Sequence, residues 1–197
     1  MNDPIIWQSA ALLLDYPGPG WPDTLGLVET AVRDRPGRAG DHLRAFLQEM
    51  RPVSAMQAAE RYVTTFDRSR RRTLYLTYYS HGDTRGRGEA LISIRERYAS
   101  YGWVGDEAEL PDYLPMMLEF TARCPAAGRE LLAEHRAGVE LLRDALREHR
   151  SPYVRVVEAV RSTLPGPGRA TQALVRGLAR TGPPAESVGL QDEGTRR

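Results

Sequence analysis

Two segments of the chain hold most of the side chains that could bind a ligand or take part in a reaction. Residues 62–88 read YVTTFDRSRRRTLYLTYYSHGDTRGRG, and residues 109–120 read ELPDYLPMMLEF. The first segment combines a run of arginines, a block of tyrosines and a polar turn, a mixture that a hydrophobic core does not require. Our candidate binding residues are nine side chains from these segments: Tyr75, Tyr78, His81, Asp83, Arg85, Asp112, Tyr113, Met116 and Glu119.

Residues of the first segment also have purely structural interpretations. His81 can be satisfied by the backbone at a helix end, and Asp83 can cap the helix that follows it. Tyrosines such as Tyr78 suit a core as well as a half-hydrated groove. Arg85 and Arg87 near a helix start are each unfavourable by roughly 0.3–1 kcal/mol because of the helix dipole. Their position therefore predicts carboxylate neighbours or an acidic partner group.

The second segment lies in a strongly acidic stretch. Residues 98–122 contain no basic residue, whereas the net charge of the whole chain is only +1. The five acidic residues of this stretch are Asp106, Glu107, Glu109, Asp112 and Glu119. Apolar side chains lie among them, including methionines, which provide an adaptable apolar surface. The pattern predicts a surface for a basic, apolar peptide; the alternative is an acidic loop, capped or solvated, over an ordinary core.

The motifs of the common enzyme classes are absent from the sequence. We find no P-loop, no nucleophile elbow and no zinc-ligand spacing. The single cysteine, Cys124, excludes an internal disulfide and suits a half-buried structural position. We therefore expect a binding protein without catalytic activity and without a metal or cofactor of its own. A small helical enzyme and a nucleic-acid binder using Arg68, Arg70, Arg71 and Arg72 are the alternatives from other classes; the small net charge does not favour nucleic acid.

Apolar periodicity predicts an all-α protein with about nine helices. Residues 73–79 alternate in a way that also suits a strand, but no second strand is available, so we predict a helix there. Ser54 and Gln57 have capping-box spacing, and Ser151 precedes a proline as a helix cap would. The nine helices are expected at about 4–14, 22–33, 40–50, 54–66, 73–79, 84–101, 111–122, 125–149 and 152–164.

The predicted organisation is one helical domain over residues 1–164. A proline- and glycine-rich break and a short basic helix follow at 165–180, and 181–197 is expected to be a disordered tail. No stretch reaches the ~18 apolar residues of a membrane span, and the N-terminus lacks a basic region before its apolar run. We therefore expect a cytoplasmic protein that is not inserted into the membrane.

The strings YVTTFD, LYLTYYSHGDTRGRG and ELPDYLPMMLEF resemble the signature blocks of the respiratory nitrate reductase molybdenum-cofactor assembly chaperones, the delta subunit family. That family belongs to the wider group of TorD-like chaperones dedicated to molybdoenzymes. The resemblance covers roughly residues 5–160. One difference is that Tyr113 stands where the family's LPDHLP motif usually has histidine.

The resemblance implies a single-domain helical bundle of the TorD-like chaperone type. It also implies a cytoplasmic chaperone for the catalytic alpha subunit of nitrate reductase. The chaperone would bind the N-terminal segment of the apoprotein until the molybdenum cofactor and an iron–sulfur cluster are inserted, before membrane docking. Cofactor-delivery proteins are possible further partners, and a related molybdoenzyme with a twin-arginine leader is the alternative client.

Overall fold

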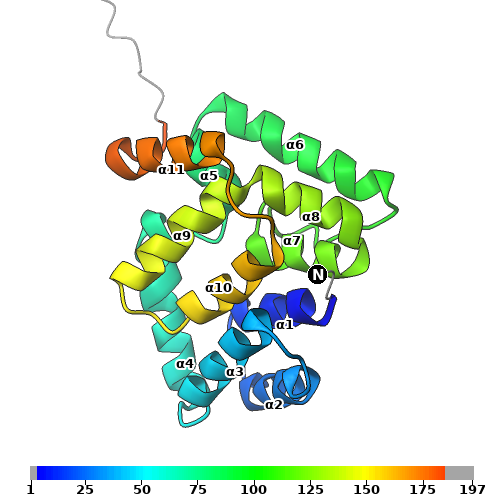
Figure 1. The fold of residues 1–197 in the computed structure, drawn as a ribbon, viewed down its shortest axis with the longest axis vertical. Helices are drawn as coiled ribbons and strands as arrows, with labels where there is room; N and C mark the ends of the chain where they lie inside the picture. The colour runs from blue at the N-terminus through cyan, green and yellow to red at the C-terminus, as the bar shows by residue number, and fades with distance from the viewer. Residues whose placement is uncertain (1–3, 185–197) are drawn as a thin grey trace, which may run out of the picture.

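The computed structural model describes residues 4–184, and its regular structure is helical throughout that range (Figure 1). The prediction of an all-α fold is confirmed. A π-helical turn at Val63–Asp67 and a 3-10 turn at Arg70–Arg72 lie between the fourth and fifth α-helices. The α-helices are α1 (Pro4–Leu14), α2 (Trp21–Val32), α3 (Arg38–Met50), α4 (Ala55–Tyr62), α5 (Leu76–His81), α6 (Arg85–Ser100), α7 (Leu114–Arg123), α8 (Pro125–Glu134), α9 (Arg136–Glu148), α10 (Val154–Thr163) and α11 (Arg169–Thr181).

Helix α1 lies at the centre of the bundle, because it packs against α7 on one side and against α2, α3 and α10 on others. Trp7 is fully buried in α1, and its Nε1 donates a hydrogen bond to Thr163 Oγ1 of α10 at 2.8 Å. In Figure 1, α2 and α3 lie at one end of the long axis, and α6 and α11 lie at the other. No helix within residues 4–184 combines the length and apolar character needed to cross a membrane.

Local sequence signals explain several helix starts. The predicted capping box is confirmed: Ser54 Oγ accepts from the Gln57 N–H at 3.3 Å, and Gln57 Oε1 accepts from the Ser54 N–H at 3.1 Å. Pro115 and Pro125 occupy first-turn positions of α7 and α8, where a missing N–H costs little.

Three helix predictions are wrong in detail. The helix predicted at 125–149 is interrupted at His135, so that α8 packs on α7 while α9 turns towards α5. Ser151 does not cap α10, which begins at Val154; its hydroxyl is buried 3.5 Å from Thr65 Oγ1. Thr73 and Tyr75 are extended before α5 begins, and Tyr75 forms an isolated antiparallel bridge with Tyr113. The alternating apolar pattern of residues 73–79 is therefore explained in part by this one bridged residue pair and not by a β-strand.

A buried ion-pair network joins α9 to α10. Arg136 and Glu140 are almost fully buried, and their Nη2 and Oε1 atoms lie 2.7 Å apart. Arg161 adds a contact from its Nε to Glu140 Oε2 at 2.9 Å. Burial opposes ionisation of Glu140, but the hydrogen bonds from the two arginines outweigh it and hold the pKa of Glu140 below its usual value.

We predict that Glu140→Gln makes stability less dependent on pH in the acidic range. The lowered pKa means that ionised Glu140 stabilises the fold above its unfolded value of 4.5, and that this contribution is lost as pH falls through the folded pKa. At neutral pH the substitution should cost about 3 kcal/mol, since it leaves buried arginine charge uncompensated. Urea unfolding at neutral and acidic pH measures both effects. Glu134→Gln is the control, because Glu134 is exposed and its pair with Arg97 should contribute only about 0–1 kcal/mol.

Gly128 allows the close approach of α8 to α7. A Cβ atom at this position would overlap the backbone and side chain of Thr121, which is fully buried in α7. We expect Gly128→Ala to destabilise the fold by about 1–3 kcal/mol, as overpacking does. Gly177 in α11 has open space around its Cα, so Gly177→Ala should be neutral or stabilising by about 0.4–1 kcal/mol. Equal unfolding free energies for the two variants would contradict this packing argument.

Candidate functional site

Asp112 is the residue that holds the two sequence segments together. Its side chain is fully buried just before α7. Asp112 Oδ2 accepts hydrogen bonds from the Thr77 N–H at 3.1 Å and the Thr77 hydroxyl at 2.5 Å. The Leu76 N–H also donates to the Asp112 carbonyl oxygen at 3.0 Å. Asp112 therefore satisfies the first N–H groups of α5 from a distant part of the chain, in place of a local cap.

Arg87 of α6 supplies the positive charge beside this carboxylate. Its Nη2 lies 3.5 Å from Asp112 Oδ2, and its Nη1 lies 3.8 Å from Asp83 Oδ1. Its guanidinium carbon lies 5.9 Å from the ring centres of both Tyr75 and Tyr78, a cation–π distance. The carboxylate neighbours predicted for the arginines at this helix start are thus present for Arg87. Its side chain is mostly buried between these carboxylates and the two rings.

Two tyrosines continue the link towards α1. The rings of Tyr75 and Tyr113 lie 5.4 Å apart, and the Tyr75 hydroxyl donates to Glu109 Oε1 at 3.0 Å. Burial, together with this hydrogen bond, raises the pKa of Tyr75 to about 12. The hydroxyls of Tyr113 and Tyr62 lie 3.0 Å apart, and the Tyr62 hydroxyl donates to the Leu14 carbonyl at the end of α1. At the position where the resemblance led us to expect histidine, Tyr113 therefore has a hydroxyl bonded to a second tyrosine.

A hollow of about 330 Å³ opens beside Tyr113, between α1 and residues 106–119. We call it the acidic pocket, because four of its lining residues are carboxylates and none is basic. Its apolar part is formed by alanine, leucine, proline and methionine side chains. The full lining is Gln8, Ala11, Leu12, Asp15, Asp106, Glu109, Tyr113, Pro115, Met116 and Glu119.

A second hollow of about 390 Å³ extends the acidic pocket towards α6. The two hollows share Asp106, Glu109 and Met116. Beyond these residues the second hollow is lined by Trp103, with Arg95 as its one basic lining residue. The combined surface alternates carboxylates with aromatic and sulfur-containing side chains, which suits a ligand that carries both positive charge and apolar groups.

The nine predicted residues do not form one cluster. Tyr113, Met116 and Glu119 line the acidic pocket, and Tyr75 reaches its edge through Glu109. Asp112 is buried behind them, so the expectation that it belongs to the exposed acidic surface is wrong. The reason is that α5 requires its oxygens as acceptors.

The remaining four residues lie around the α5–α6 turn. Tyr78 lines a different hollow, beneath α11. His81 Nδ1 lies 3.2 Å from the Thr77 carbonyl, the backbone alternative considered for it. Asp83 does not cap α6, because Thr84 occupies the cap position; Asp83 instead pairs with Arg70 at 2.8 Å. Arg85 is exposed in the first turn of α6.

Asp15 and Gln8 are the polar lining residues of the acidic pocket that we did not predict from the sequence. They come from α1 and the residue after it, about 90 positions before the acidic stretch. A signal was present, since Gln8, Leu12 and Asp15 have the spacing of one helix face and two of them are polar in a largely apolar run. That pattern alone does not show which part of the chain this helix face packs beside.

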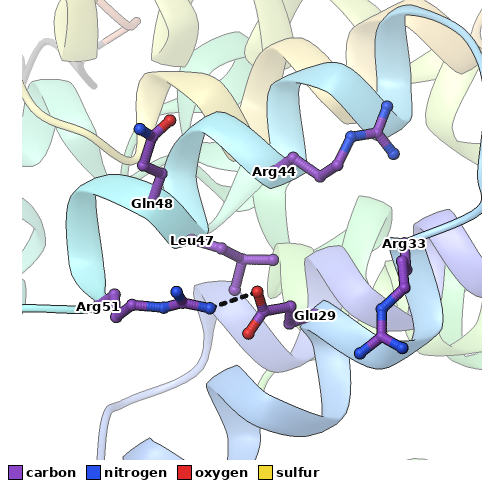
Figure 2. A pocket seen from close by; sticks show the side chains of 6 residues that line it. All are labelled: Glu29, Arg33, Arg44, Leu47, Gln48 and Arg51. Carbon is purple, nitrogen blue, oxygen red and sulfur yellow. Dashed lines mark hydrogen bonds and ion pairs between the residues drawn. The ribbon is translucent and has the colours of Figure 1, made fainter.

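A basic hollow of about 330 Å³ between α2 and α3 is a weaker candidate (Figure 2). Arg51 Nη2 contacts Glu29 Oε1 at 2.5 Å. Arg44 Nη1 donates to the carbonyls of Val32 and Arg35 at 2.7 and 2.9 Å. Arg44 thus holds the α2–α3 connection and Arg51 links the end of α3 to α2, so the hollow is explained as part of the scaffold. Within residues 4–184, no group of three or more His, Cys, Asp or Glu side chains is placed to hold a metal ion.

Comparison with known proteins assigns the family. The family model described as nitrate reductase delta subunit matches residues 33–158, which include both segments that form the site. The chain belongs to the nitrate reductase delta subunit family. The resemblance found in the sequence is therefore confirmed.

Individual relatives differ in how much of their length they share with this chain. The Mycobacterium tuberculosis nitrate reductase-like protein NarX is 41% identical over 157 residues, which are 79% of this chain and 24% of NarX. The probable nitrate reductase molybdenum cofactor assembly chaperone NarJ of Bacillus subtilis is 31% identical over 165 residues, 81% of this chain and 88% of that protein. Escherichia coli NarJ is 32% identical over 116 residues, which are 57% of this chain and 49% of that protein. The chain thus spans about a quarter of NarX but most of the Bacillus protein.

We predict that Asp112→Asn lowers the unfolding free energy by about 1–3 kcal/mol, because it removes the charge that faces Arg87 from a buried acceptor. Glu107→Gln is the matched control, since Glu107 is an exposed carboxylate of the same acidic stretch and surface changes usually stay within about 0.5 kcal/mol. Urea unfolding of both variants measures the difference. Equal unfolding free energies for the two variants would contradict the structural role of Asp112.

Proposed function

We propose that this chain is an assembly chaperone for a nitrate reductase and that the acidic pocket captures a basic, partly apolar segment of its client. The observation that carries the proposal is the lining of the pocket, which has four carboxylates, no basic side chain and an apolar part. The names of the Bacillus and Escherichia relatives describe nitrate reductase molybdenum cofactor assembly chaperones, which supports this class of role. Those relatives are chaperones and not catalysts, in agreement with the prediction that the chain is not an enzyme.

The client segment that we propose is the N-terminal segment of the apo catalytic subunit. Arginines of such a peptide would face Asp15, Glu109 and Glu119, while its apolar side chains would contact Met116 and the exposed part of α1. This is peptide capture in a groove, in which a few anchors fix the register. By holding the segment, the chaperone would keep the apoprotein open until its molybdenum cofactor and iron–sulfur cluster are in place, in the cytoplasm and before membrane docking.

The alternative functions receive less support from the geometry. The arginine run, which a nucleic-acid binder would use, contacts its own chain: Arg70 pairs with Asp83, Arg71 with Glu148, and Arg72 donates to the Thr65 carbonyl. A related molybdoenzyme with a twin-arginine leader is the alternative client, because the acidic pocket would accept that basic segment by the same chemistry. No observation among the described residues favours a catalytic role.

The direct test is a pull-down with the catalytic subunit of nitrate reductase in its apo and cofactor-loaded forms. The proposal expects capture of the apo form and little capture of the loaded form. If the chain captured a related molybdoenzyme in preference to nitrate reductase, that molybdoenzyme would replace nitrate reductase as the proposed client. Absence of binding to either form would contradict the chaperone function.

The pocket is tested separately, with a peptide copy of the client N-terminus. We predict that the double variant Asp15→Asn, Glu119→Gln binds the peptide more weakly by about 1–3 kcal/mol and with a smaller salt dependence, because fewer charge-assisted contacts remain. Glu96→Gln on the exposed side of α6 is the control and should bind as the wild type does. If the double variant keeps wild-type affinity and salt dependence while the pull-down succeeds, the function stands and the acidic pocket is the wrong site.

A further inference from the structure

The hollow that extends the acidic pocket carries one basic side chain, Arg95 of α6, at the side away from α1. Arg95 is exposed, and it forms no ion pair with any residue of the described range 4–184. Asp106, Glu107 and Glu109 line the same hollow, so carboxylates are available nearby and are not used to neutralise it. The guanidinium group is therefore left for a partner outside the chain or for solvent.

Trp103 forms an apolar wall of this hollow. Its ring centre lies 4.7 Å from that of Tyr98 and 5.5 Å from that of Phe120. The backbone at Gly105 passes so close that a Cβ atom there would lie 2.9 Å from Met116 Sδ and 2.9 Å from the Trp103 ring. These contacts fix the position of the indole, so the wall exists before any ligand binds.

Apolar surface remains open to solvent beside this wall. Val104 lines the same hollow and is 77% exposed, although it follows directly after Trp103. An apolar side chain placed between Val104 and the indole would remove apolar surface of both partners from water, which favours binding. The middle of the combined surface therefore suits an apolar anchor.

Charge changes sign along the combined surface. The acidic pocket, with its carboxylates and no basic residue, lies beside α1. Asp106, Glu109 and Met116 join it to the second hollow, where the apolar wall and then Arg95 of α6 follow. A surface that only attracts positive charge has no use for an unpaired arginine, whereas complementary charges of both signs fix the register of a bound segment.

We propose that the combined surface selects a segment with three features: basic side chains for the acidic pocket, an apolar side chain for Trp103 and Val104, and an acidic side chain for Arg95. The inference rests on the proposed function, because the occupant is the client segment proposed above. It adds the acidic side chain and a fixed placement, with the basic part of the segment beside α1 and its acidic part beside α6. A segment that is basic throughout would be disfavoured, because it places positive charge against Arg95.

The test measures how Arg95→Glu changes the affinity of the full chain for a peptide copy of the client N-terminus. If Arg95 faces an acidic side chain, the charge reversal should weaken binding about threefold or more, because it replaces an attraction by a repulsion. General attraction of a basic peptide predicts the opposite, tighter binding to a more acidic surface. Fluorescence anisotropy at physiological ionic strength, where distant charges are screened, measures the sign of the change.

A second set of peptides identifies the contact. Each acidic residue of the peptide is replaced by arginine in turn. One of these peptides should bind the wild type more weakly and should regain affinity for Arg95→Glu, because opposite charges face each other again. Arg155→Glu is the matched control, since Arg155 is exposed in α10 and lines neither hollow. It should bind the original peptide as the wild type does.

Arg95→Glu should unfold in urea as the wild type does, because Arg95 is exposed and unpaired within residues 4–184. If it is less stable, Arg95→Gln repeats the test with a smaller expected loss of affinity. Unchanged or tighter peptide binding by the Arg95 variants would overturn the inference and leave the proposed function standing, and so would the failure of every peptide substitution to restore binding. Absence of peptide binding to the wild type would overturn the peptide-capture part of the proposed function as well.

Discussion

The carboxylate of Asp112 is the constraint on which the candidate site depends. A six-residue helix such as α5 has almost no stability of its own, and α5 begins without a local side-chain cap. Asp112 replaces that cap through two hydrogen bonds to Thr77. Burial of a carboxylate is costly unless it is paired, and Arg87 provides the pair. The same three residues therefore fix α5, the first turn of α6 and the approach to α7.

This arrangement explains why two different surfaces lie on either side of α5. On one side, the rings of Tyr75 and Tyr113 pack where these two residues form an isolated bridge, and Glu109 connects them to the acidic pocket. On the other side, Tyr78 lines the hollow beneath α11. The guanidinium of Arg87 lies at cation–π distance from both Tyr75 and Tyr78, so one cation contacts a residue of each surface. A change at Arg87 would consequently disturb both and would be a poor choice for separating their roles.

The sequence predicted the helical class and most helix positions because apolar periodicity and capping residues are local signals, as Ser54 and Gln57 show. From the helix dipole it also predicted either carboxylate neighbours or an acidic partner group for Arg85 and Arg87, and Arg87 has the carboxylate neighbours. It did not predict the break at His135 or the extended backbone before Leu76, because both result from packing partners far along the chain. The prediction of residues 181–197 as a disordered tail lies largely outside the described residues, although α11 continues to Thr181.

The assignment of Asp112 to the surface failed for a reason that applies beyond this residue. A run of acidic residues in a sequence indicates excess charge but not which members of the run satisfy backbone groups inside the fold. In this chain the structure removes Asp112 from the acidic surface and adds Asp15 from the end of α1, so the pocket and its extension still present five carboxylates: Asp15, Asp106, Glu107, Glu109 and Glu119. Because exposed charges act together over a screening length of about 8 Å, the identity of each carboxylate matters less for attracting a basic segment than their number around one hollow. The acidic surface expected from the sequence is therefore present without Asp112, and Asp112 itself has a structural role.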